Sequence, residues 1–388
     1  MIRQKPNVLS RAVEVIRESS RERPADAVLR EALRGERELS AVDAREVSRA
    51  VFAYFRWFGW LDRKLPLEVR IERALEFDAR FRKAPFTLPA ENLRTKAVPA
   101  WLAAEMDLNE RWLRFLQREP RLWLRARKGQ GRALAKRLRN ARCRERALSE
   151  ALVYEGSKNL FETEEFQSGA FEIQDITSQL VGVLCNPKPG ETWWDACAGE
   201  GGKTLHLSDL MENQGLIWAT DRADWRLEKL KQRAARAKAF NYRSALWDGG
   251  PELPMKTPFD GVLVDAPCSG VGTWQRNPHA RWTTTLQDVK ELAAVQKRLL
   301  AHVAPGVKPG GKLVYSVCTL TRAETAEVVL DFNGAHSEFE PLRLHDPRLA
   351  KEFGSAHPGT ATLTIWPYVW GGNGMFVAAW RRKPVDSV

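Results

Sequence analysis

Strand-like apolar runs that alternate with helical segments, and that repeatedly end in aspartate, constrain the fold of this chain more than any other feature. This pattern begins near residue 171, and a charged helix is expected at 226–239. Alternation at this spacing predicts a doubly wound, mostly parallel sheet, an α/β fold that binds ligands beyond the carboxyl ends of its strands. The expected strands lie at 191–197, 216–221, 259–265 and 312–318, the last after a turn at 308–311, with a further strand approaching Asp248.

The amino-terminal part of the chain has helical periodicity instead. Apolar residues recur at helical spacing, and Ser40 with Asp43 three residues later is typical of a helix N-cap. Residues 83–99 contain three prolines and little periodicity, which predicts a linker. We therefore expect a helical domain at 1–82, a linker at 83–99, a small basic α+β subdomain at 100–168 and the α/β domain at 169–384.

Positive charge is concentrated in one stretch of the chain. The net charge of all 388 residues is +12, and residues 111–146 alone carry 14 basic and two acidic side chains. Aromatic side chains such as Trp112, Phe115 and Trp123 interleave with the charges, so this stretch is expected to fold and to present a basic surface with an aromatic component, as nucleic-acid binders do. The candidate RNA contacts here are Arg121, Arg125, Arg127, Lys128, Arg132, Lys136 and Arg137.

Other classes of protein are disfavoured by what the sequence lacks. No apolar run approaches the ~18 residues that a membrane helix requires, and the first residues do not form a secretory signal. The five cysteines are widely spaced without a C-x-x-C pair, which argues against a disulfide framework and against a zinc site. We expect a cytoplasmic monomer with no metal.

A glycine-rich loop follows the first strand of the α/β region and allows three interpretations. A phosphate-binding loop needs glycine five places before Gly202, where the chain has Cys197. The dinucleotide fingerprint G-x-G-x-x-G is not present either. The third interpretation is S-adenosylmethionine, whose methionine end approaches bare backbone. Asp221 is then expected to accept the ribose hydroxyls, and Asp248 to lie by the adenine.

Two cysteines indicate which methylation chemistry this would be. Cys268 follows one predicted strand, Cys318 ends the next, and Asp265 precedes Cys268 by three residues. Either cysteine alone is more simply explained as a small buried apolar residue. Together they favour covalent catalysis, because thiolate addition at carbon 6 of a pyrimidine makes carbon 5 nucleophilic enough to attack a methyl group. A carboxyl group near ring nitrogen 3, supplied by Asp265, would stabilise the adduct.

At these residues the sequence resembles the Fmu/Sun-type (RsmB-type) RNA cytosine-5 methyltransferases. Motifs similar to those of the family occur in order at 174–179, 195–204, 265–273, 276–278, 315–320 and 374–378. The resemblance implies a Rossmann-like class I methyltransferase domain, with Cys318 as nucleophile, Cys268 assisting product release and Arg276 at the RNA. It also implies cofactor binding by Cys197, Ala198, Gly199, Glu200, Gly201, Gly202 and Lys203, completed by Asp221, Asp248 and Asp265. The helical amino-terminal region resembles, more weakly, the NusB-like RNA-binding domain of bacterial members.

The sequence departs from the family pattern at three places near the expected site. The mildest is Val317-Cys318-Thr319 in place of the commoner Thr-Cys-Ser. Gly199-Glu200 replaces the usual alanine-proline and adds a negative charge near the cofactor, and Thr325 stands where asparagine is expected. The expected function is methylation of ribosomal RNA at cytosine carbon 5. The alternatives are a transfer-RNA methyltransferase with the same chemistry and a catalytically silent RNA-binding ribosome-assembly factor.

Overall fold

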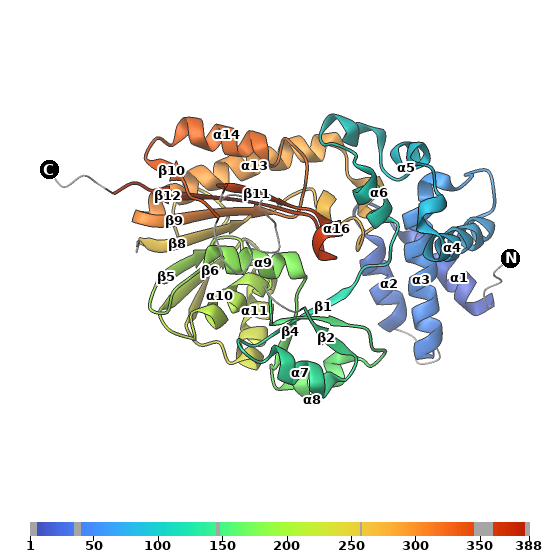
Figure 1. Cartoon of the computed structure of the whole chain (residues 1–388), viewed down its shortest axis with the longest axis horizontal. Helices are drawn as coiled ribbons and strands as arrows, with labels where there is room; N and C mark the ends of the chain where they lie inside the picture. The colour runs from blue at the N-terminus through green and yellow to red at the C-terminus, as the bar shows by residue number, and fades with distance from the viewer. Residues whose placement is uncertain (1–5, 35–39, 145–147, 257, 345–359, 385–388) are drawn as a thin grey trace. The chain divides into compact units, whose positions relative to one another are not determined.

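The computed structural model describes residues 6–34, 40–144, 148–256, 258–344 and 360–384 and divides into two compact units (Figure 1). The first unit comprises Met1–Pro120 and Gly270–Val289, and the second comprises Arg121–Ser269 and Lys290–Val388. The chain therefore passes between the units three times. These limits differ from the predicted boundaries, because a segment within the expected α/β domain belongs to the amino-terminal unit.

The first unit is helical, as its apolar periodicity predicted. Ser40 caps its third helix, where the Ser40 hydroxyl oxygen accepts a hydrogen bond from the Asp43 backbone N–H at 3.1 Å. The apolar stripe of that helix, including Val47, Val51 and Tyr54, is buried in the core of the unit. Its elements are α1 (Pro6–Glu18), α2 (Ala25–Arg34), α3 (Ala41–Trp57), η1 (Phe58–Trp60), α4 (Leu67–Lys83), η2 (Pro85–Thr87), α5 (Ala90–Lys96), η3 (Ala100–Ala104), α6 (Glu110–Leu116), η5 (Val271–Thr273) and α12 (Ala280–Thr283).

Residues 83–99 are not a linker, contrary to the sequence prediction. They contain η2 and α5, and Leu93 on α5 is fully buried. Pro85 and Pro89 lie at or just before the first residues of these helices, where a missing backbone N–H leaves no hydrogen bond unmade. The prolines therefore mark helix starts within the unit.

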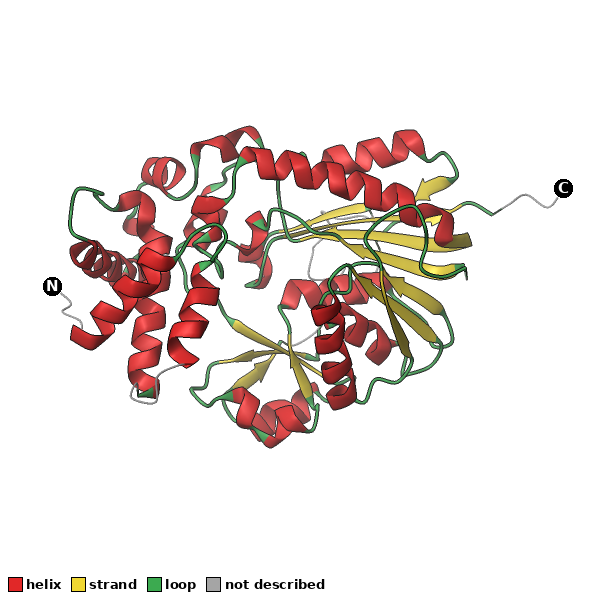
Figure 2. Cartoon of the chain, turned by 180° about the vertical axis from the view of Figure 1, so that it is seen from behind, coloured by secondary structure: helices red, strands yellow, loops and turns green. Residues whose placement is uncertain are grey.

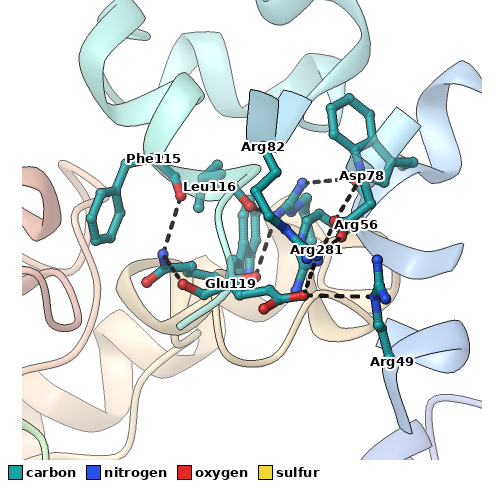
Figure 3. A network of polar contacts seen from close by, with 11 residues as sticks. Arg49, Arg56, Asp78, Arg82, Phe115, Leu116, Glu119 and Arg281 are labelled. Carbon is teal, nitrogen blue, oxygen red and sulfur yellow. Dashed lines mark hydrogen bonds and ion pairs between the residues drawn. The ribbon is translucent and has the colours of Figure 1, made fainter. Parts of the chain in front are cut away.

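One buried cation joins four segments of the first unit. Arg281 is fully buried and donates hydrogen bonds to four backbone carbonyls, those of Arg56, Ala97, Leu116 and Trp274. Figure 3 shows Arg281 beside Arg56 and Leu116. Burial, reinforced by the nearby charge of Arg56, lowers the pKa of Arg281 to about 9. The segment that contains Arg281 is thus integral to the helical core.

A small four-stranded antiparallel sheet begins the second unit. Its strand order is β2-β3-β1-β4, and α7 packs against its strands over a core that includes Leu124, Leu134 and Leu152. This sheet confirms the expected α+β character of the basic region. Its elements are β1 (Leu122–Ala126), α7 (Gly131–Leu138), β2 (Ala141–Cys143), β3 (Ala151–Tyr154), η4 (Leu160–Glu162), α8 (Glu164–Gln167) and β4 (Phe171–Ile173).

The remainder of the second unit is the doubly wound α/β domain. Its sheet has the order β10-β12-β9-β8-β5-β6-β7, with β11 paired to β12. The pairs β5–β6, β6–β7, β5–β8 and β8–β9 are parallel, whereas β12 runs antiparallel to β9. The strands are β5 (Thr192–Asp195), β6 (Leu216–Asp221), β7 (Tyr242–Leu246), β8 (Phe259–Asp265), β9 (Val307–Val317), β10 (Phe339–Pro341), β11 (Thr362–Ile365) and β12 (Met375–Arg382).

Helices cover both faces of this sheet (Figure 2). Side chains that alternate along the strands enter opposite cores, so that Trp193 packs with α9 and α10 while Trp194 packs with α13. Figure 1 shows α13 and α14 on one face and α9, α10 and α11 on the other. The helices are α9 (Ile176–Cys185), α10 (Gly202–Leu210), α11 (Asp224–Ala237), α13 (Leu286–Val303), η6 (Ala304–Gly306), α14 (Ala326–Ala335) and α16 (Pro367–Trp370).

In the part of the chain that the structure describes, no helix is both long enough and apolar enough to cross a membrane. The same residues contain no cluster of three or more histidine, cysteine, aspartate or glutamate side chains able to hold a metal ion.

Candidate active site

The glycine-rich loop connects the central strand β5 to α10. Gly199 has φ of +55° and Gly201, the N-cap of α10, has φ of +83°. A Cβ atom at Gly201 would lie 2.6 Å from Cγ of Leu230, so glycine is required there for space as well as for backbone conformation. A Cβ atom at Gly199 would meet nothing within 4 Å. The loop therefore presents bare backbone to an open space.

That open space is a pocket of about 340 Å³ at the carboxyl ends of the parallel strands. Three of the predicted strand-end carboxylates line it, those of Asp221, Asp248 and Asp265. From the glycine loop, Cys197, Ala198 and Gly199 also line it. β6 and β8 flank β5 on opposite sides, which is where the winding of the sheet reverses and where such folds bind ligands.

Asp221 holds the glycine loop as well as facing the pocket. Its Oδ2 accepts the Gly199 backbone N–H at 3.0 Å, and its Oδ1 accepts the Ala223 N–H at 2.9 Å. The Arg226 guanidinium is 3.6 Å from Oδ2. Asp248 is exposed, and among the described residues its Oδ1 accepts only a local hydrogen bond, from Gly250 N–H at 2.8 Å. Asp221, by contrast, is held by groups from the glycine loop and from α11.

Asp195, the fourth strand-end carboxylate, is absent from the pocket lining. Its side chain is fully buried, and Oδ2 accepts the Thr204 hydroxyl at 2.7 Å. Oδ1 has no hydrogen-bond partner among the described residues. Burial raises the pKa of Asp195 to about 7 despite the Thr204 hydrogen bond, which acts in the opposite direction. Asp195 thus stabilises the loop through its hydrogen bond with Thr204 and does not line the pocket.

Lys203 was predicted to bind the cofactor, but it is not among the residues that line the pocket. It forms an ion pair with Asp265 instead. The Lys203 Nζ lies 2.5 Å from Asp265 Oδ2, while Asp265 Oδ1 accepts the Ser316 hydroxyl at 2.7 Å. Burial alone would lower the pKa of Lys203, but the charge and the hydrogen bond of Asp265 outweigh it, so the pKa is raised. Lys203 thereby fixes the orientation of a carboxylate that lines the pocket.

Glu200, Gly201 and Gly202 are likewise not among the residues that line the pocket. The Glu200 carboxylate pairs with Lys229 on α11 at 3.0 Å. The extra negative charge expected near the cofactor is thus balanced by a neighbouring cation. The loop backbone is held in addition by Arg233, which donates to the Glu200 carbonyl at 3.0 Å.

The two predicted catalytic cysteines are neighbours. The Sγ atoms of Cys268 and Cys318 are 3.2 Å apart, and both side chains are half-buried. Pro267, which immediately precedes Cys268, lines the pocket. The structure therefore brings together Cys268, Cys318 and Asp265. They lie at or just after the carboxyl ends of β8 and β9, which are adjacent and parallel.

Glu324 connects the two cysteine-bearing loops, and sequence reasoning did not identify it as a site residue. Its fully buried carboxylate accepts the Ser269 backbone N–H at 2.8 Å and the Thr319 hydroxyl at 3.1 Å. Thus Glu324 binds the residue that follows Cys268 and the residue that follows Cys318. The only signal in the sequence was the position of Glu324 in the segment 322–325, in which Thr325 was the residue noted as a departure from the family pattern.

Glu324 has further donors on both of its oxygens. The Ser269 hydroxyl donates to Oε2, as does the Thr321 hydroxyl at 2.8 Å. The Gln296 side-chain amide donates to Oε1 at 3.0 Å and to the Pro267 carbonyl at 2.9 Å. No cation pairs with Glu324 among the described residues, so its charge is stabilised by hydrogen bonds alone.

Sequence analysis also missed the apolar wall of the pocket. Trp247, Val295 and Leu299 line it, the last two from α13. Trp247 follows β7 directly, so its position at the end of a predicted strand could have identified it from the sequence. Val295 and Leu299 lie on one stripe of an amphipathic helix, and their helical spacing cannot distinguish a pocket wall from ordinary core.

The predicted RNA contacts differ in their exposure to solvent and in whether a carboxylate already pairs with them. Arg125 is 2% exposed and is occupied by Asp209 at 2.6 Å and by the Gln174 side-chain oxygen at 2.6 Å, so its assignment to RNA was wrong. Arg127 is mostly buried and pairs with Asp209 at 3.0 Å. The exposed predicted contacts in the second unit are Arg121, Lys128, Arg132, Lys136 and Arg137, of which Lys128 pairs with Glu212 at 2.7 Å. Arg276 is also exposed and belongs to the first unit.

The expected aromatic component of this basic surface was wrong as well. Trp112 is fully buried, Phe115 is 8% exposed and Trp123 is 4% exposed. The basic stretch is also divided between the units, since Pro120 ends one and Arg121 begins the other. Of the exposed predicted contacts in the second unit, Arg132, Lys136 and Arg137 lie on α7.

The sheet order, the glycine turn after β5 and the carboxylates at the strand ends define a Rossmann-like methyltransferase fold. The family described as 16S rRNA methyltransferase RsmB/F matches residues 182–381, just over half of the chain. The chain belongs to this family, which confirms the resemblance seen in the sequence. The likeness of the first unit to a NusB-like domain stays a prediction.

Individual relatives agree with this family. The probable ribosomal RNA small subunit methyltransferase B of Synechocystis sp. is 39% identical over 224 residues, covering 56% of this chain and 49% of that protein. The tRNA (cytosine(72)-C(5))-methyltransferase NSUN6 of Mus musculus is 38% identical over 171 residues, covering 40% of this chain and 35% of that protein. This chain thus spans about half the length of the ribosomal RNA methyltransferases that it matches.

Solved structures share the fold. The crystal structure of PH0851 has a TM-score of 0.80 at 24% identity and covers 98% of this chain and all of that chain, which shows a common fold. A methyltransferase homologue from Pyrococcus horikoshii has a TM-score of 0.59 at 30% identity, covering 70% of this chain and 90% of that chain.

Proposed function

We propose that this chain transfers a methyl group from S-adenosylmethionine to carbon 5 of a cytosine in ribosomal RNA. The observation that carries the proposal is the pair of thiols, 3.2 Å apart, at the ends of strands whose neighbouring residues line the pocket. Family membership and the relatives named as ribosomal RNA methyltransferases support the substrate class. The relative named as a tRNA cytosine-5 methyltransferase supports the same atom of the base and makes tRNA the second candidate substrate.

The residues that line the pocket fit S-adenosylmethionine. Bare backbone at Gly199 leaves open space, three carboxylates suit a ligand with cationic and hydroxyl groups, and Trp247 with Leu299 supplies an apolar surface for a base. We assign the ribose hydroxyls to Asp221, because two backbone N–H groups hold that carboxylate in place. When bound, the cofactor supplies an electrophilic methyl group.

Two cysteines allow addition and elimination to be divided between them. The Cys318 thiolate would add to carbon 6 of cytosine, and the electron pair released towards carbon 5 would form the new bond to the methyl carbon. The bond from that carbon to the positively charged sulfur of the methyl donor would break at the same time, with its electron pair left on that sulfur. The carbon-5 proton then passes to a base, the bond from carbon 6 to sulfur breaks and its electron pair returns to Cys318. We assign assistance in this elimination to Cys268. The Asp265 carboxylate, oriented by Lys203, accepts a hydrogen bond from ring nitrogen 3 once that nitrogen is protonated.

Alanine variants of the two cysteines test this division. Each variant is incubated with ribosomal RNA and S-adenosylmethionine and resolved on a denaturing gel. Cys318→Ala lacks the nucleophile, so it should form neither 5-methylcytosine nor a covalent complex. Cys268→Ala should still attack and transfer methyl but release product slowly, which leaves a protease-sensitive band of retarded RNA.

Controls and alternative outcomes separate the competing hypotheses. Cys143→Ala, which changes a half-buried cysteine of β2, should behave as wild type. A retarded band from Cys318→Ala instead of Cys268→Ala would exchange the two roles. Equal activity of both variants would identify two packing cysteines and refute covalent catalysis. Parallel incubation with tRNA decides between the two substrate classes.

A further inference from the structure

Gln174 is a buried residue that joins the small antiparallel sheet to the start of α10. It lies between β4 and α9 and is 7% exposed. The Gln174 side-chain nitrogen donates to the carbonyl of Gly202, the first residue of α10, at 3.1 Å. Its backbone N–H donates to the Trp123 carbonyl on β1 at 3.2 Å. The reaction described above does not use this residue.

Two neighbours determine which way the Gln174 amide points. Arg125 Nε donates to the amide oxygen at 2.6 Å, and a guanidinium group can only donate. A carbonyl oxygen can only accept, so the group that faces Gly202 must be the amide N–H. An amide satisfies both neighbours at once, whereas a carboxylate has no hydrogen to offer to Gly202. The contacts at this position therefore require glutamine rather than glutamate.

Arg125, which fixes the direction of the amide, is itself held firmly. It is 2% exposed, and it lies on β1, a strand that pairs with both β3 and β4. Its Nη1 donates to Oδ2 of Asp209, near the end of α10, at 2.6 Å. The small sheet is therefore connected to α10 at two places, through Gln174 near the start of the helix and through Arg125 near its end.

The contact with Gln174 complements the contacts that hold the glycine loop from the methyltransferase domain. Asp221 at the end of β6 accepts the Gly199 N–H, and Arg233 on α11 donates to the Glu200 carbonyl. These two contacts act on the loop before α10 begins. Gln174 acts on the next turn of the chain, from a segment that belongs to neither β6 nor α11.

Gly202 lies between residues that have defined tasks at the site. Gly199, three residues earlier, lines the pocket. Lys203, the next residue, forms the ion pair that orients the Asp265 carboxylate. A shift of the Gly202 peptide would therefore displace both the bare backbone that faces the ligand and the cation that holds Asp265.

From these contacts we propose that Gln174 is a positioning residue for cofactor binding, which holds the start of α10 where the pocket requires it. Arg125 acts with it by fixing the direction of the amide. This inference rests on the proposed function in that S-adenosylmethionine is the ligand. It gives Arg125 a task at the cofactor site in place of the RNA contact that the sequence predicted.

Gln174→Glu tests the proposal, because it replaces one amide nitrogen by an oxygen at nearly constant volume. Burial lowers the pKa of Arg125, so an added carboxylate stabilises its charge, and the variant should melt close to the wild-type temperature. The new oxygen faces the Gly202 carbonyl, however, and two acceptors repel. By calorimetry, S-adenosylmethionine should bind about tenfold more weakly, the factor expected for one lost buried hydrogen bond.

Two further measurements follow the same variant. Hydrogen exchange without any ligand should be about tenfold faster over residues 198–206, because this segment opens more often, whereas exchange in β9 should keep its wild-type rate. In methylation assays the KM for S-adenosylmethionine should rise about tenfold while kcat stays within about twofold, because saturating cofactor restores the position of the loop. Gln174→Met loses the same N–H without burying a charge, and it should weaken cofactor binding at least as much.

Two control variants separate positioning from general stability. The Ser178 hydroxyl lies 3.4 Å from the same amide nitrogen, so Ser178→Ala removes this second acceptor and leaves the contact with Gly202 in place. It should bind the cofactor with wild-type affinity. Gln179 is a second buried glutamine, and it donates to the carbonyls of Leu124 and Gln174, neither of which belongs to α10. Gln179→Met should lower the melting temperature without changing cofactor affinity.

The results that overturn this inference differ from those that overturn the proposed function. Wild-type cofactor affinity and wild-type exchange in Gln174→Glu would refute the positioning role, as would an equal loss of affinity in Ser178→Ala. If the wild type methylates RNA and Gln174→Glu keeps its affinity, only this inference fails. If the wild type binds S-adenosylmethionine but methylates neither rRNA nor tRNA, the proposed function fails, and a weaker-binding Gln174→Glu variant still supports the role of Gln174.

Discussion

Replacing Glu324 with alanine should separate the two cysteine-bearing loops. The carboxylate accepts hydrogen bonds from Ser269 and Gln296 on its Oε1 and from three hydroxyl groups on its Oε2. Hydroxyl groups rotate to find other acceptors, but the Ser269 backbone N–H and the Gln296 amide have fixed directions. Alanine therefore leaves two buried donors without an acceptor.

The expected cost follows from those two donors. Each unsatisfied buried donor costs about 1–3 kcal/mol, so local opening of the Ser269 loop should become easier by about 2–6 kcal/mol. Glu324→Gln keeps one acceptor oxygen for both fixed donors, and its amide N–H groups can donate to the hydroxyl oxygens. The glutamine variant should lose only about 1–2 kcal/mol, mainly because its hydrogen bonds are no longer charge-assisted.

Hydrogen exchange of the peptide that contains Ser269 measures this opening directly. A loss of 2 kcal/mol corresponds to exchange about 30-fold faster, since each 1.4 kcal/mol is a factor of ten. The second readout is oxidation of Cys268 and Cys318 to a disulfide by diamide, which is reduced to its hydrazine. The pair should oxidise more slowly in Glu324→Ala than in wild type, because the thiols are no longer held 3.2 Å apart.

Glu327→Ala is the matched control, since Glu327 lies three residues further along, is exposed and pairs only with Arg322 at 3.0 Å among the described residues. It should leave both the exchange rate and the oxidation rate at wild-type values. Wild-type exchange and oxidation in Glu324→Ala would refute the role of this carboxylate in positioning the two loops.

Three further predictions concern other groups of the second unit. The pKa of Asp195 is raised from 3.8 to about 7 in the folded state, so between these values the native protein retains a proton that the unfolded chain releases, and stability falls as pH rises. Urea-unfolding curves from pH 5 to pH 7 should show a loss of about 2–3 kcal/mol in wild type that Asp195→Asn lacks, and parallel curves would contradict the assignment. Asp221→Asn should weaken binding of S-adenosylmethionine by about 1–3 kcal/mol, and wild-type affinity by calorimetry would rule out its contact with the ribose. Replacing the exposed cations of α7 with glutamine should lower the salt dependence of RNA binding by about 0.7 log units per lost contact, whereas an unchanged slope would place RNA elsewhere; these cations are Arg132, Lys136 and Arg137.

The parallel sheet and its pocket could be predicted because their signals are local. Strands buried on both faces appear as short apolar runs, and a run ending in Asp221 or Asp265 places that carboxylate at the edge where ligands bind. The glycine turn carried equally local information. The start of β9 was less clear, because the expected turn at 308–311 is incorporated in that strand, with Gly310 at a φ of +79°.

Contacts between distant segments explain what the sequence could not reveal. Arg125 counts as a cation in any charge profile, yet its partner Asp209 lies 84 residues further along the chain. Glu324 reaches Ser269 across 55 residues. Whether a charged side chain faces solvent, binds RNA or pairs with a buried carboxylate depends on which segments the fold brings beside it. The periodicity of the sequence carries no information about those contacts.

The discontinuity of the helical unit has a consequence for how the protein is made. A ribosome extends the chain from its amino terminus, so residues 1–120 emerge well before residues 270–289, which complete the same unit. Until Arg281 arrives, the carbonyls of Ala97 and Leu116 lack the guanidinium that binds them in the finished structure. Four of the eight strands of the methyltransferase sheet, β5 to β8, are synthesised during that interval. The helical unit therefore cannot be completed before residue 289 has been synthesised, and a nascent chain released earlier carries an incomplete helical core.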